Sequence, residues 1–236
     1  MTFLRILLLA ILIAPFASAQ GRAFTVCKGD GDRNCFTGRF GLNDIPGDPA
    51  HKLIAHDFGF MDSKGVGWQT NAGAKTDGAS IPPLLRPLVG SPWEEEYIRA
   101  AVIHDWYCVR RVQTWQDTHR VFYDAMLASG MKPAKAKLMF YAVYAFGPIW
   151  GWPTGGQTCS GTPNCIQSTF AGQPYVVVPD SYGDLKNQAE LRAMEAVIDL
   201  AETGAGFSPE QLMAIADKAH PKPDLSGKPR ATGITE

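Results

Sequence analysis

The order of apolar and polar positions divides the chain into a short β region, a block of three helices and a second helical segment near the C-terminus. Residues 52–61 and 66–70 are predicted strands, and the sequence DSKG between them is a hairpin turn signal. Amphipathic or apolar helices are predicted at 91–109, 114–130, 133–147 and, as a pair, within 184–220. We therefore expect an α+β fold, with a small antiparallel β region packed on a three-helix unit and a C-terminal helical hairpin.

Capping residues indicate where these helices start, and the spacing of apolar residues indicates which positions are buried. Ser91 precedes Pro92, and Glu94 follows three residues after Ser91, which is typical of a capped helix start. Thr114 and Ser208 have the same capping chemistry at two later starts. The predicted core residues are Ile98, Val102, Trp106, Val121, Met126, Met139 and Val143.

The two ends of the chain differ in composition from its middle. Residues 1–19 have a charged start, an apolar centre and a small-residue ending, which predicts a signal peptide cleaved after Ala19. An uncleaved membrane anchor is the alternative. We expect export to the periplasm or beyond, a main domain at 20–183, a helical hairpin at 184–220 and a disordered tail at 221–236.

Five cysteines lie in the part expected to be exported. Cys27 with Cys35, and Cys159 with Cys165, each bracket a polar, glycine-containing loop and are predicted disulfides. Metal binding is the alternative, although neither pair has the CxxC spacing. Cys108 belongs to neither pair. Because it lies on an apolar helix face, we expect it to be a buried, unreactive thiol.

Charge narrows the range of partners. The formal net charge is -1, so no basic excess indicates nucleic-acid binding. After the first segment, no second apolar run is long enough for a membrane span. A lipid or membrane surface remains a candidate partner.

Candidate chemistry is concentrated in TDGASIP at 76–82, HDWY at 104–107 and THRVFYDAM at 118–126. His104 can act as a general base at neutral pH. Asp105 points about 100° away from it on a helix and can hold a cation. Asp77 and the flexible backbone at Gly78 can add oxygen ligands for calcium.

The residue that orients His104 is left open by the sequence. His119, Tyr123 and Asp124 are all candidates if the second helix packs against the first. A zinc site of His104, Asp105 and His119, with or without Asp77, is an alternative to calcium. A further alternative is that the His–Asp pair only links helices.

Aromatic residues are the candidate substrate contacts. Trp106 and Tyr107 directly follow the His–Asp pair. Trp150 and Trp152 flank a glycine in a predicted loop, where they can line an apolar groove or contact a membrane interface.

Two resemblances involve these motifs. TDGASIPPLL, AAVIHDWYC and HRVFYDAM, in this order over roughly residues 50–150, resemble the bacterial and phage family called domain of unknown function 1353, which implies no activity. The same stretches are similar to secreted bacterial phospholipases A2. That resemblance implies His104 as the water-activating base, Asp105 as a calcium ligand and further oxygens from the loop at Asp77. Where those enzymes place a supporting Asp, this chain has His119.

These observations lead to a hypothesis about function. We expect an exported, metal-dependent hydrolase acting on an ester, with lipid as the favoured substrate class and calcium as the cation. A non-enzymatic protein of the cell envelope, or an interaction protein, is the alternative.

Overall fold

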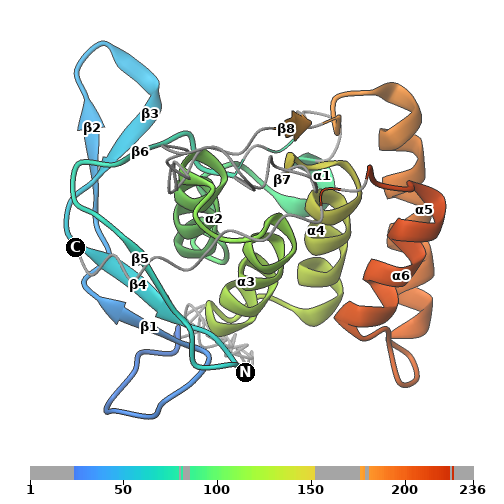
Figure 1. Cartoon of the computed structure of the whole chain (residues 1–236), viewed down its shortest axis with the longest axis horizontal. Coiled ribbons are helices and arrows are strands. Elements are labelled where there is room, and N and C mark those ends of the chain that lie inside the picture. The colour runs from blue at the N-terminus through green and yellow to red at the C-terminus, as the bar shows by residue number, and fades with distance from the viewer. Residues whose placement is uncertain are drawn as a thin grey trace, which may run out of the picture.

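The chain has an α+β architecture, as predicted from the sequence (Figure 1). The computed structural model describes residues 24–79, 81, 86–151, 176–178, 181–223 and 225. The strands β1 to β6 lie on one side, α2, α3 and α4 form the centre, and α5 and α6 lie on the opposite side.

In the described part of the chain, the strands form three small antiparallel sheets. The first sheet has the order β1-β4-β5, the second β2-β3-β6, and the third pairs β7 with β8. Their bounds are β1 Cys35–Gly38, β2 Leu42–Ile45, β3 Asp48–Ile54, β4 Phe58–Met61, β5 Gly67–Thr70, β6 Lys75–Thr76, β7 Ile149–Gly151 and β8 Val176–Val178.

The helices follow the predicted order along the chain. Their bounds are α1 Arg86–Val89, α2 Ile98–Arg110, α3 Trp115–Ala128, α4 Pro133–Phe146, α5 Leu185–Ala201 and α6 Pro209–Ala219. Thr114 caps α3 by accepting from the Asp117 N–H, and Ser208 forms a capping box with Gln211 at α6. Both of these predicted helix starts are confirmed.

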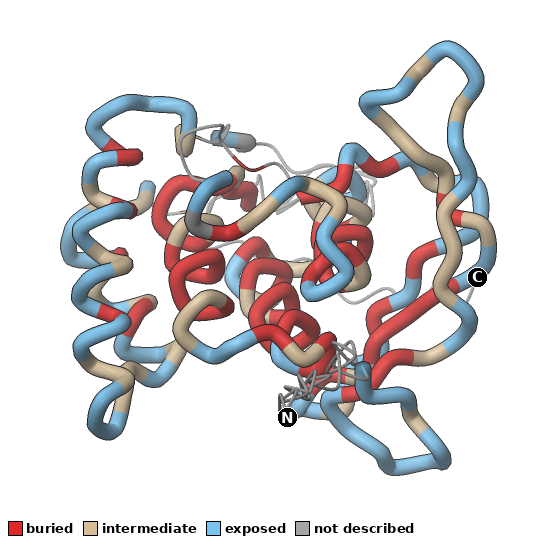
Figure 2. The backbone as a smooth tube through the Cα atoms, turned by 180° about the vertical axis from the view of Figure 1, so that it is seen from behind, coloured by how far each residue is buried: buried red, intermediate tan, exposed pale blue. Residues whose placement is uncertain are grey.

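The buried residues lie mainly in α2, α3, α4 and the strands next to them (Figure 2). One core cluster extends from the first sheet through α2, α3 and α4 to Leu191 and Ile198 of α5 and Leu212 of α6. The C-terminal helices therefore share this core. Most predicted core residues are buried, namely Ile98, Val102, Val121, Met126 and Met139. Trp106 and Val143 are only half-buried, because both line a cavity.

The predicted strand at 52–61 is wrong in one respect, since it is two strands in two different sheets. The pairing of β3 ends at Ile54, which bonds to Ala74 and Gly73. The carboxylate of Asp57 then accepts from the Ala72 N–H at 2.9 Å, and β4 continues in the first sheet. The hairpin from β4 to β5 through DSKG is confirmed.

The predicted helix start at Ser91 is also wrong, because α2 begins at Ile98. The carbonyl of Pro92 accepts from the Ala79 N–H at 3.0 Å, so the loop before the helix is held by a contact to another segment. The Glu94 carboxylate still accepts from the Ser91 N–H at 3.2 Å. The capping chemistry is therefore used in a turn instead of a helix.

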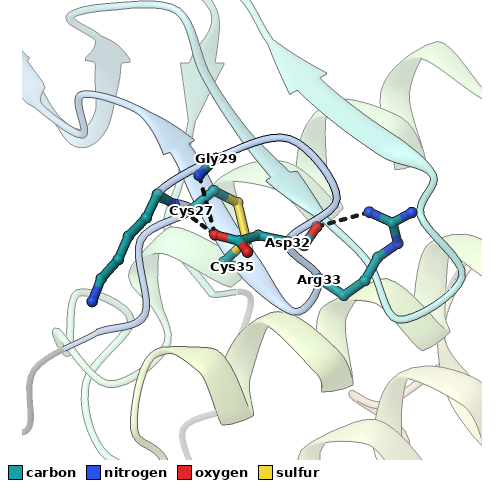
Figure 3. Close-up of a disulfide and its surroundings, with 6 residues drawn as sticks. Cys27, Gly29, Asp32, Arg33 and Cys35 are labelled. Atoms are coloured by element: carbon teal, nitrogen blue, oxygen red, sulfur yellow. Dashed lines mark hydrogen bonds between the residues drawn. A yellow bond between two sulfur atoms is a disulfide. The ribbon is translucent and has the colours of Figure 1, made fainter.

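A disulfide joins Cys27 to Cys35, as predicted (Figure 3). Inside this loop the Asp32 carboxylate accepts from the backbone N–H groups of Lys28 at 2.7 Å and Gly29 at 3.2 Å. The disulfide therefore closes a short, internally bonded loop.

Several expectations fall outside the described residues. These are the signal peptide at 1–19, the Cys159–Cys165 pair, Trp152 and most of the tail after residue 223. Within the described part of the chain, no helix has the length and apolar character needed to cross a membrane.

Candidate functional site

A cavity of about 610 Å³ lies between α2, α4 and the loop that follows β6. Most of its wall is apolar, formed by side chains such as Val89, Phe122, Leu138 and Met139. Cavities of this size and character are typical small-molecule sites. Asp77, His104 and Asp105 all border this cavity, so the structure brings together the glycine turn and the His–Asp pair.

The glycine turn is held against α2 by a short chain of hydrogen bonds. The Thr76 hydroxyl donates to the Asp105 carboxylate at 2.8 Å and accepts from the Gly78 N–H at 3.0 Å. Gly78 has a φ of 79°, which an L-residue seldom adopts. Gly78 thus positions Asp77. Asp77 borders the cavity, whereas Gly78 does not.

His104 is buried on α2 and contacts His119 of α3. Their Nε2 and Nδ1 atoms are 2.8 Å apart, and His119 Nε2 lies 3.0 Å from the carbonyl oxygen of Pro148. Because a carbonyl only accepts, His119 Nε2 must carry a proton. With His119 neutral, its Nδ1 accepts from the Nε2–H of His104. The structure therefore selects His119 among the three candidate partners.

The pKa values of the two imidazoles are driven apart. Burial lowers the pKa of His104, but its interactions with Cys108 and Asp105 outweigh burial and raise this pKa to about 10. Burial, followed by the charge on His104, lowers the pKa of His119 well below its ordinary value. Of the two imidazoles, His104 is therefore the one that binds a proton more readily.

Asp105 lies next to this charge without a close contact. Its Oδ1 is 3.9 Å from Nδ1 of His104. Burial raises the pKa of Asp105, while the nearby charge of His104 and the hydrogen bond from Thr76 act in the opposite direction. His104 and Asp105 are neighbours in the sequence, but each has its own surroundings, and these surroundings shift the two pKa values separately.

Cys108 is the residue that the sequence reasoning missed. It is a free, half-buried thiol that borders the cavity. Its Sγ lies 3.5 Å from Nε2 of His104. The expectation that this thiol is buried is therefore wrong, because Cys108 is half-buried at the cavity wall. The signal was present, because positions 104 and 108 share a helix face.

Other predicted site residues lie elsewhere. Tyr123 packs on Phe140, away from the cavity wall, with ring centroids 5.5 Å apart. The Tyr107 hydroxyl accepts from the Gln69 N–H at 3.0 Å, which links α2 to β5. Of the predicted substrate contacts, Trp106 borders the cavity.

Trp150 is not in a loop, since it belongs to β7 and is buried in the core. Its Nε1–H donates to the Gln113 carbonyl at 2.8 Å. The ring lies against His119 with centroids 6.1 Å apart. Trp150 therefore packs against His119 in the core instead of facing a groove.

Residues 53–143 match the family described as "Protein of unknown function (DUF1353)". "Uncharacterized protein y4iH" of Sinorhizobium fredii (strain NBRC 101917 / NGR234) is 56% identical over 233 residues, which is 98% of this chain and 97% of that protein. The chain belongs to this family of proteins of unknown function. The family prediction from the three motifs is confirmed, and the matched region contains Asp77, His104, Asp105, Cys108 and His119.

A second relative is more distant. "Uncharacterized protein y4jT" of the same organism is 38% identical over 133 residues, covering 51% of this chain and 40% of that protein. No solved structure matches the chain. These matches name no activity, and they lend no support to the resemblance to phospholipases A2.

Proposed function

We propose that this protein is an exported, metal-dependent hydrolase that cleaves an ester bond in a substrate with an apolar group. The observation that carries the proposal is the cavity of about 610 Å³, whose mainly apolar wall includes His104 and two carboxylates. An apolar wall can accept an acyl chain. The imidazole and the carboxylates can bind a cation and orient the attacking water. Lipid esters are the favoured substrates for that reason.

The reaction consists of the addition of water to the ester carbonyl. The water oxygen bonds to the carbonyl carbon, the bond to the alcohol oxygen breaks, and a proton from water ends on the departing alcohol. A cation bound beside His104 would stabilise the negative charge that develops on the carbonyl oxygen. The polar groups around His104 would hold this cation, and the apolar wall would limit access of bulk water.

A structural role for the imidazole pair is the competing function. The hydrogen bonds from His104 to His119 and from His119 to Pro148 link α2, α3 and the segment before β7. A protein of the cell envelope that binds a partner without chemistry would use the pair in this way. That alternative predicts a stable protein with no esterase activity.

Hydrolysis of p-nitrophenyl esters with short and long acyl chains, and of phosphatidylcholine vesicles, tests the proposal. The metal-free protein is assayed after addition of Zn²⁺ or Ca²⁺. We expect activity with one cation and a preference for long acyl chains. In Ala142→Phe, a larger side chain enters the cavity wall, so hydrolysis of the long-chain ester falls more than that of the short one.

His56→Gln is the matched control, because His56 is exposed and lies away from the cavity lining. It retains full activity. Circular dichroism and the urea midpoint establish that each variant is folded. A folded wild-type protein that hydrolyses none of these esters with either cation contradicts the proposal, as does an equal effect of Ala142→Phe on short and long chains.

A further inference from the structure

We propose that His104, Cys108 and His119 form a binding site for a divalent transition-metal ion, with Zn²⁺ the best match. Each side chain offers one ligand atom, and the three atoms lie within 4.8 Å of one another. The closest approaches involve Nε2 of His104, Nδ1 of His119 and Sγ of Cys108. Use of this ion in hydrolysis rests on the proposed function, whereas its binding does not.

The ligand spacing is close to that of a tetrahedral site. Bonds of about 2.0–2.1 Å to nitrogen and about 2.3 Å to sulfur place two nitrogens about 3.3 Å apart, and nitrogen and sulfur about 3.6 Å apart. Sγ of Cys108 is 3.5 Å from Nε2 of His104, which already matches. The two imidazole nitrogens are 2.8 Å apart and must separate by about 0.5 Å. A small rotation of either ring would provide this opening. The ligand atoms of the third pair, Cys108 and His119, lie within 4.8 Å of each other.

The second nitrogen of each ring faces the kind of partner that metal-bound histidines use. Such a histidine usually donates its other N–H to a backbone carbonyl or a carboxylate, which fixes the ring. Nε2 of His119 lies 3.0 Å from the Pro148 carbonyl oxygen. Nδ1 of His104 lies 3.9 Å from the Asp105 carboxylate, an ion-pair distance that is longer than a hydrogen bond. In the proposed site Asp105 would act as a positioning residue behind this ligand.

The site has an accessible side. His104 and Cys108 border the cavity, while His119 is fully buried behind them. Three protein ligands with one remaining position toward a cavity is the arrangement of catalytic zinc, in contrast to the four protein ligands of structural zinc. Water or a substrate oxygen can take the fourth position.

The donor set also selects the ion. A thiolate and two imidazoles suit Zn²⁺ and related transition metals. Calcium takes about 6–8 oxygen ligands. Among the described residues that border the cavity, the carboxylates are Asp77 and Asp105. Zn²⁺ therefore takes the place of the calcium expected from the sequence.

Metal titration of the full-length, metal-free protein tests this site. Zn²⁺ binding is followed by calorimetry, and Co²⁺ binding by absorption, because a thiolate ligand adds a charge-transfer band in the near ultraviolet. We expect one equivalent of each ion and a cobalt spectrum of tetrahedral type. In Cys108→Ser the charge-transfer band disappears and Zn²⁺ affinity falls at least tenfold.

Asp105→Asn and His56→Gln separate the roles of the neighbours. Asp105→Asn keeps the thiolate band and loses about 10–100-fold in affinity, which is typical for an outer partner of a ligand. His56→Gln binds as the wild type does. The unfolding midpoint in urea shows whether each variant is folded, and Cys108→Ser is informative because its position is only half-buried.

The outcomes distinguish the two proposals. Absence of Zn²⁺ and Co²⁺ binding, or binding that Cys108→Ser leaves unchanged, overturns the metal site. Zn²⁺ binding with no hydrolysis of any ester leaves this site intact and removes the proposed hydrolase. Hydrolysis supported by Ca²⁺ in a protein without Zn²⁺ affinity overturns the metal site and leaves the proposed hydrolase intact.

Discussion

Gly78→Ala tests the close approach that places the glycine turn beside the site. The backbone of Gly78 has a φ of 79°, and an added Cβ would lie 2.6 Å from the carbonyl oxygen of Pro92. That oxygen accepts from the Ala79 N–H at 3.0 Å. The substitution therefore strains the backbone and displaces a segment that the turn is bonded to.

The magnitude follows from these two effects. A left-handed backbone at an L-residue costs about 1–2 kcal/mol. Displacing Pro92 weakens its hydrogen bond to Ala79 and leaves a donor in a buried position, at about 1–2 kcal/mol. We therefore expect Gly78→Ala to lower the free energy of unfolding by about 2–4 kcal/mol.

Gly73→Ala is the matched control for this substitution. Gly73 has a φ of 82°, and a Cβ there would meet nothing within 4 Å. Only the backbone effect remains, so we expect a loss of about 1–2 kcal/mol. Urea unfolding followed by circular dichroism gives both values by linear extrapolation. Equal losses for the two variants would refute the close contact between the turn and Pro92.

Two further substitutions test the core and a hairpin outside the site. Leu191→Ala, in the buried face of α5, should lower the free energy of unfolding in urea by about 2–5 kcal/mol, while Leu200→Ala, at a position 74% exposed on the same helix, should change it by less than about 0.5 kcal/mol. Similar values for the two would show that α5 does not share the core. Asp62→Ala should cost about 2–3 kcal/mol, because this carboxylate accepts from Val66 N at 2.8 Å and from the buried Nε1–H of Trp68 at 3.0 Å. Asp62→Asn retains part of this acceptor capacity, so a loss as large as that of Asp62→Ala in the same assay would count against the reasoning.

The sequence alone determined the features that depend on neighbouring residues. Thr114 and Ser208 cap their helices because a cap needs only a side-chain oxygen and the N–H groups of the next turn. The DSKG turn likewise closes its hairpin through local bonds. The placement of His104 on a helix beside Asp105 also follows from local pattern.

The tertiary structure decided everything that depends on segments far apart in the chain. It selected His119 as the partner of His104, and it placed Trp150 behind that pair instead of in a groove. It also divided residues 52–61 between two sheets and gave the capping sequence at Ser91 a role in a turn. The physical reason is that periodicity records which face of an element is apolar, whereas its partners depend on how the elements pack.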